Sequence, residues 1–169
     1  MRAVSILPCL LPLLATLACG GAGERVVPAE GPWAVIAKEV VQDDCGLTEL
    51  DVSFQLPGGF ELEEADSSGF RFLPDNDDQW RECSLEAPTK DGTPFDCEDL
   101  GGTEGGKLEA GPYDMGFTWS TEGLVLSEDE LEMDLSMDLS CAGDGCAEIA
   151  DHYGFVFPCA LRAGLSAEG

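Results

Sequence analysis

The segment LEMDLSMDLSC, residues 131–141, alternates strictly between apolar and polar side chains. Its apolar positions are Leu131, Met133, Leu135, Met137 and Leu139, and its polar positions are Glu132, Asp134, Ser136, Asp138 and Ser140. A period of two residues is the pattern of a β-strand that has one face buried and the other in water. The segment therefore predicts a long strand that packs one face on the core of a β domain.

The same alternation recurs along the chain. Further strands are predicted at residues 50–56, 60–63, 70–72, 80–85, 94–99, 113–120 and 153–161. Pro57-Gly58-Gly59 predicts a turn between the first two of these strands. Residues 33–41 fit either a first strand or a short helix, because alanine, lysine and glutamate dilute their β character. The glycine-rich residues 101–112 are predicted to form the longest loop.

About eight antiparallel strands with short turns and little helical pattern predict an all-β domain, either an up-and-down barrel or a sandwich. GPW, residues 31–33, resembles the Gly-x-Trp that begins lipocalin-like barrels, and this resemblance implies a calycin-like barrel. An outer-membrane barrel would alternate in the same way. We favour a soluble barrel, because the strands pair apolar faces with acidic ones and the chain carries several cysteines.

The N-terminus has the pattern of an export signal. Arg2 is followed by an uncharged run over residues 3–18. A helix that spans a bilayer needs about 20 apolar residues, and this run is shorter and is interrupted by Pro8 and Pro12. Residues 1–18 are therefore predicted to be a signal peptide rather than a permanent membrane span.

ATLAC, residues 15–19, resembles the lipobox of bacterial lipoproteins. The resemblance implies that the sulfur of Cys19 receives a diacylglycerol, that cleavage precedes Cys19, and that the new amine is acylated. Gly20 in place of aspartate implies export to the outer membrane in Gram-negative lipoproteins of this kind. Several acyl chains hold a protein far more firmly than one. The alternative is an ordinary signal peptide cleaved near Ala18 or Ala22.

On this interpretation, Cys19 and the residues up to 32 form a lipidated, flexible tether, and residues 33–169 form one acidic β domain. Six cysteines remain in that domain: Cys45, Cys83, Cys97, Cys141, Cys146 and Cys159. An even number of cysteines in an exported chain predicts a disulfide framework, with 15 connectivities open for six cysteines. A zinc site is poorly supported, because the domain has no CxxC pair and its single histidine is His152.

Two pairings have local support. Cys83 and Cys97 lie about symmetrically around a turn at residues 90–92, so we expect them to pair. Cys141 and Cys146 bracket a Gly-Asp-Gly turn, and a disulfide between them would clamp that turn. A redox role for the second pair would favour a thiol near a helix N-terminus, and the sequence predicts a hairpin loop there instead.

The net charge of −26, from 34 acidic and 8 basic side chains, limits the partners. Nucleic acid and anionic lipid surfaces would repel such a chain. We expect the acidity to form mainly a solvated surface, with no cofactor. The candidate calcium ligands are Asp75, Asp77 and Asp78, which lie in a predicted turn but do not match the pattern of a calcium-binding loop.

No catalytic motif accompanies His152, neither G-x-S-x-G nor H-E-x-x-H. We therefore expect a non-enzymatic lipoprotein that is anchored to the outer membrane through acylated Cys19, on its periplasmic or cell-surface side. Its role would be structural, or the binding of an unidentified protein or small molecule. The alternatives are a lipocalin-type carrier of a small apolar ligand and a hydrolase that uses carboxylates.

Overall fold

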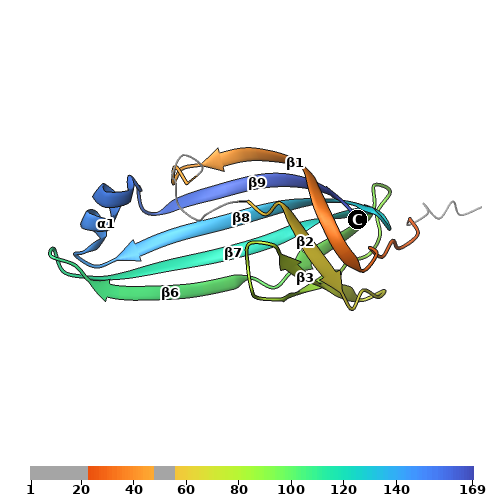
Figure 1. Ribbon diagram of the computed structural model, residues 1–169, viewed down its shortest axis with the longest axis horizontal. Coiled ribbons are helices and arrows are strands. Elements are labelled where there is room, and N and C mark those ends of the chain that lie inside the picture. The colour runs from red at the N-terminus through yellow and green to blue at the C-terminus, as the bar shows by residue number, and fades with distance from the viewer. Residues whose placement is uncertain (1–22, 48–55) are drawn as a thin grey trace, which may run out of the picture.

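The computed structural model describes residues 23–47 and 56–169 (Figure 1). Within these ranges the chain forms nine strands and one short helix. They are β1 (Gly31–Asp43), β2 (Gly59–Glu63), β3 (Gly69–Pro74), β4 (Arg81–Leu85), β5 (Thr93–Cys97), β6 (Leu100–Lys107), β7 (Pro112–Ser127), β8 (Glu130–Ala142), α1 (Cys146–Tyr153) and β9 (Cys159–Glu168). The prediction of an all-β domain is confirmed.

Eight of the strands close into an antiparallel barrel. The strand order in the sheet is β5-β4-β3-β2-β1-β9-β8-β7-β6, and every neighbouring pair is antiparallel. The ring closes because β5 also pairs with β7, where Thr93 lies opposite Val125 and Asp96 lies opposite Glu122. Of the two architectures left open by the sequence, the structure has the barrel, with β6 outside the ring.

The sheet continues beyond the barrel as an open extension. Residues 122–125 of β7 pair with β5, whereas residues 112–119 pair with β6. Figure 1 shows β6, β7, β8 and β9 running side by side away from the barrel, with α1 at the far end. We call this part, made of residues 100–107, 112–119, 136–142 and 159–162, the sheet extension.

Side chains fill the barrel interior. The main core consists of Trp33, Phe60, Leu62, Phe70, Phe72, Cys83, Leu85, Phe95, Cys97, Val125, Leu131, Met133, Leu135, Leu165 and Ala167. The ring of Trp33 stacks on Phe60 at 5.8 Å, and its indole N–H donates to the carbonyl of Ala29 at 3.0 Å. Leu131, Met133 and Leu135 of the opening segment lie in this core, as their alternation predicts.

A second, smaller core lies on the same face of the sheet extension. It is built from Cys45, Leu47, Met137, Leu139, Cys159 and Leu161, and Trp119, Phe155 and Phe157 pack against it. Residues 33–41, for which a strand and a helix were both possible, belong to strand β1. The predicted strand at residues 50–56 lies almost entirely outside the described residues.

The loop predicted at residues 101–112 is wrong, because most of that segment is strand β6. Two of its four glycines lie opposite aromatic residues of β7: Gly102 opposite Phe117, and Gly106 opposite Tyr113. A Cβ at Gly102 would come within 2.6 Å of the Phe117 ring, and one at Gly106 within 2.7 Å of Tyr113. Each ring therefore covers the bare backbone of a glycine, which lets a glycine-rich segment remain in the sheet.

The strand predicted at residues 153–161 is wrong over its first six residues, since α1 ends at Tyr153 and β9 begins at Cys159. Alanine and glutamate favour the helix, and Gly154, with a φ of 78°, ends it in the left-handed conformation. The alternating aromatics instead stack on one another, Tyr153 on Phe155 at 5.5 Å and Phe155 against Phe157 at 5.6 Å.

The folded part of the chain begins before residue 33. The backbone N–H of Val26 donates to the hydroxyl of Thr93 at 2.8 Å, and that of Ala29 donates to the carbonyl of Glu128 at 2.7 Å. Val26 and Val27 also pack against the main core. These residues, which fall within the expected tether, are therefore held on the barrel.

Candidate functional site

Three disulfides staple the domain. Cys83 and Cys97 lie opposite each other on β4 and β5, and their disulfide belongs to the main core. Cys45 is bonded to Cys159 within the second core. The third bond joins Cys141, near the end of β8, to the first residue of α1. The predicted lipidation site, Cys19, lies outside the described residues.

The calcium candidates Asp75 and Asp77 have different partners. A carboxylate oxygen of Asp75 accepts the backbone N–H of Gly58 at 3.0 Å, whereas Asp77 pairs with Arg81 at 3.0 Å. The backbone N–H of Asp78 donates to Asp77 at 2.8 Å. Within residues 23–47 and 56–169, no group of three or more acidic, histidine or cysteine side chains is arranged to hold a metal ion.

Arg81 is a buried cation that the sequence analysis missed. Its side chain is 5% exposed and donates to the hydroxyl of Thr121 at 3.1 Å and to Asp77 at 3.0 Å. It lines a small cavity of about 150 Å³ with Asp77, Trp119 and other residues. The sequence does contain a signal for this burial: Arg81 lies two residues before the buried Cys83 on β4, so both side chains face inward.

His152 is exposed near the end of α1, and its ring contacts Tyr153 edge-to-face at 4.6 Å. It therefore lies at the far end of the sheet extension, on the element that Figure 1 shows away from the barrel.

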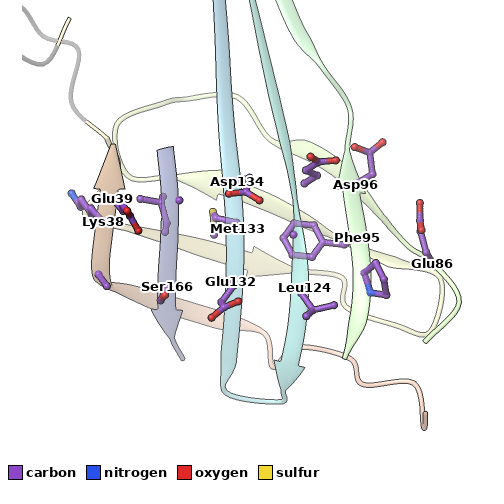
Figure 2. Close-up of a pocket in the computed structure, with 16 residues that line it drawn as sticks. Lys38, Glu39, Glu86, Phe95, Asp96, Leu124, Glu132, Met133, Asp134 and Ser166 are labelled. Carbon is purple, nitrogen blue, oxygen red and sulfur yellow. The ribbon is translucent and has the colours of Figure 1, made fainter. Parts of the chain in front are cut away.

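A groove of about 900 Å³ lies on the outside of the barrel wall. It crosses strands β1, β9, β8, β7 and β5. The groove-lining Asp134 and Asp96 are outward-facing, since they alternate along their strands with the buried Met133 and Phe95. Figure 2 shows the side chains of Glu39, Asp134 and Asp96 at one level across the groove, each on a different strand.

Strand register places carboxylates in one row across this groove. Asp96 lies opposite Glu122, and Glu122 lies opposite Asp134. Asp134 in turn lies opposite Gly164, and Gly164 opposite Glu39. Neighbouring strands lie about 4.8 Å apart, so the backbones of three acidic residues follow one another at about that spacing. Like charges directly opposite each other destabilise a sheet, so the row has a cost to folding.

Nearby cations do not offset this row. The groove is lined by six carboxylates: Glu39, Glu86, Asp96, Glu122, Glu132 and Asp134. Its one basic side chain is Lys38, whose amine donates to the carbonyl of Leu56 at 3.0 Å. Every ion pair found among the described residues involves a carboxylate other than these six. The groove therefore has a net negative charge.

Small and apolar residues form the remainder of the groove. Gly164 adds no side chain in the middle of the row, and Ala37, Pro94 and Leu124 lie along the groove beside the acids. A Cβ at Gly164 would meet Asp134 at an ordinary 3.6 Å, so space does not require glycine there. A bare floor between carboxylates leaves room for a ligand with both alkyl and cationic parts.

Comparison of the chain with protein-family models, with curated proteins and with solved structures finds no match. In the described part of the chain, no helix has the length and apolar character needed to cross a bilayer.

Proposed function

We propose that the protein is a non-enzymatic binding protein, anchored at the outer membrane through acylated Cys19, whose acidic groove binds a short Lys/Arg-rich segment of a partner protein. One observation carries the choice of ligand. Asp96, Glu122 and Asp134 lie in direct cross-strand register, and no ion pair in the described part of the chain includes them. A bound polycation would relieve the repulsion between these carboxylates, and this relief would make the free energy of binding more favourable.

The shape of the groove favours an extended ligand over a single ion. Its carboxylates are distributed over several strands, and the described residues contain no cluster able to chelate a metal. Five strands span about 19 Å, which is the length of about six residues of an extended peptide. The alkyl stems of lysine and arginine could cover Leu124 and Pro94 while their charges meet the acids.

The filled barrel interior favours a ligand on the outside over a lipocalin-type carrier. The region in which a carrier would hold its ligand contains Trp33, Phe60, Phe72 and the other core side chains. Cavities for drug-sized ligands measure about 300–1,000 Å³, a range that the outer groove reaches and the cavity beside Arg81 does not.

The anchor fits the charge of the domain. A domain this acidic is repelled by anionic headgroups, so it would need a covalent anchor to stay at a membrane surface. A Cys19→Ala precursor should lose lipid labelling and leave the membrane fraction. Labelling and membrane retention of that variant would contradict the anchor while leaving the groove proposal standing.

Binding at the groove is tested by mapping a hexalysine peptide onto the ¹⁵N-labelled domain by NMR at physiological salt. We expect the largest shifts at Glu39, Asp96, Glu122, Asp134 and Gly164. Shifts spread evenly over the acidic surface would mean non-specific attraction and would contradict a groove site. A hexaglutamate peptide is the matched control and should cause no shifts.

A further inference from the structure

The three disulfides differ in their accessibility to an outside thiol. Cys45, Cys83, Cys97 and Cys159 are each at most 5% exposed. Cys141 and Cys146 are both partly exposed, at the end of the sheet extension that lies away from the barrel. Thiol–disulfide exchange requires a thiolate to reach one sulfur of the bond. Of the three disulfides, this is the one whose two cysteines are partly exposed in the folded protein.

The structure corrects the argument against a redox role for this pair. From the sequence, Cys141 and Cys146 bracket a hairpin turn, and a reactive thiol would favour a helix N-terminus. Cys146 is the first residue of α1, and its N-cap Gly145 provides no side-chain hydrogen bond to the helix. The partial positive charge of the helix end favours a thiolate at Cys146, where no capping side chain binds the helix N–H groups, and the carboxylate of Glu148 in the first turn opposes part of this effect.

We infer that Cys141–Cys146 is a thiol–disulfide exchange site that reacts with an external dithiol while the barrel stays folded. The external thiolate attacks the Cys141 sulfur, the Cys141–Cys146 bond breaks, and its electron pair passes to Cys146, whose thiolate the helix end stabilises. The second thiol of the reagent then attacks the mixed disulfide and releases Cys141. The reagent ends as a disulfide, and its two electrons and two protons reside on Cys141 and Cys146.

The surrounding fold allows this bond to open. α1 is also held by a hydrogen bond from the Gly145 N–H to the Pro112 carbonyl at 3.0 Å, and by one from the Ala110 N–H to Glu148 at 3.0 Å. Ile149, a residue of the helix, is buried. The bond closes a short loop, with a sequence separation of 5, and the other two disulfides lie in the cores. Reduction of Cys141–Cys146 therefore leaves the other two disulfides of the domain intact.

Acidic neighbours define the kind of thiol that reacts. Asp144 lies within the loop that the bond closes, and Glu148 lies in the first turn of α1. These carboxylates repel an anionic thiol and attract a cationic one. The reaction rate should therefore fall in the order cysteamine, 2-mercaptoethanol, mercaptoacetate, and the differences should shrink with added salt.

The test uses the oxidised, folded domain, with dithiothreitol as the probe, alkylation as the quench and peptide mass spectrometry as the readout. We expect Cys141 and Cys146 to be labelled at least about tenfold faster than the other four cysteines, while near-ultraviolet circular dichroism stays native. Labelling of all six cysteines at one common rate would overturn the proposal, because reduction would then require global unfolding.

Two single variants test which sulfur leaves. The thiol of Cys146 in Cys141→Ser should have a lower pKa than the thiol of Cys141 in Cys146→Ser, measured by thiolate absorbance against pH. The reverse order would overturn the assignment of Cys146 as the leaving group. The double variant Cys141→Ser/Cys146→Ser is the control, and it should keep the barrel folded and show no rapidly labelled cysteine.

Discussion

Glu122 of β7 and Asp134 of β8 are direct cross-strand neighbours on the outer wall of the barrel. Asp96 extends the same row on the next strand, so the repulsion is shared by three carboxylates. Solvation of an acidic surface does not by itself explain why three carboxylates are aligned across neighbouring strands. The alignment is the feature that the proposed binding of a basic segment explains.

The first prediction concerns the cost of this row. Glu122→Gln should stabilise the free domain by about 0.2–1 kcal/mol, because it removes a like charge from the middle of the row. Urea unfolding at low salt measures the gain, which should shrink at high salt. Glu109→Gln, an exposed residue outside the groove, is the charge-matched control and should have little effect. A loss of stability in Glu122→Gln would show that the row is not repulsive.

The second prediction concerns the buried cation. Asp77→Asn should destabilise the domain by about 2 kcal/mol, because it leaves the guanidinium of Arg81 buried without its charged partner. The double variant Asp77→Asn/Arg81→Met should recover most of the loss in urea unfolding. Asp78→Asn is the neighbouring control. Additive losses in the double variant would contradict the pairing of Asp77 with Arg81.

The carboxylate row and the buried Arg81 show what the sequence could and could not predict. Alternation in residues 131–139 predicts correctly which side chains of β8 face inward, because a strand has only two faces. It does not predict register, so the meeting of Glu122 with Asp134 could not be foreseen. Arg81 was missed because a charged residue at an inward position goes against the hydrophobic pattern that identifies strands.

The two wrong predictions, a loop at residues 101–112 and a strand at residues 153–157, also arise from contacts that a local sequence pattern does not show. Glycine disfavours strands, so β6 was predicted as a loop, and only the tertiary contact of Gly102 with Phe117 reverses that preference. The aromatic alternation at residues 153–157 arises from rings that stack against one another, which a strand pattern imitates. One error lies in the sheet extension and the other beside it, and in both places contacts of aromatic rings outweigh local propensity.

The third prediction tests the covering of β6 by aromatic rings. Gly102→Ala should destabilise the domain by about 0.5–1.5 kcal/mol relative to Gly101→Ala, because the new methyl would push the partly exposed ring of Phe117 out of its preferred rotamer. Gly101→Ala, whose Cβ would lie an ordinary 3.5 Å from the nearest backbone oxygen, is the matched control. Equal effects of the two substitutions in thermal unfolding would contradict a specific contact between Gly102 and Phe117.

The fourth prediction concerns pH. The side-chain hydroxyl of Ser68 donates to Asp66, as do the backbone N–H groups of Ser68 and Gly69, and these hydrogen bonds lower the pKa of Asp66 below its ordinary value. The folded-state pKa is the lower one, so the contribution of Asp66 to stability is fully present above its unfolded-state pKa. That contribution is lost as pH falls through the folded-state pKa.

An NMR titration of the Asp66 carboxyl checks this prediction. Ser68→Ala removes the largest cause and should raise the pKa of Asp66 toward its ordinary value. Ser84→Ala, on the neighbouring strand β4, is the control and should leave the pKa of Asp66 in place. Titration of Asp66 at its ordinary value in the unaltered protein would contradict the role of these hydrogen bonds.

Calorimetric titration with hexalysine at physiological salt is the most direct test of whether the aligned carboxylates bind a basic segment. We expect Glu122→Gln/Asp134→Asn to weaken binding by at least about tenfold, equivalent to about 1.4 kcal/mol. The charge-matched control Glu109→Gln/Asp151→Asn, outside the groove, should bind like the unaltered protein. Equal affinities in the two double variants would contradict the claim, since binding would then follow net charge alone.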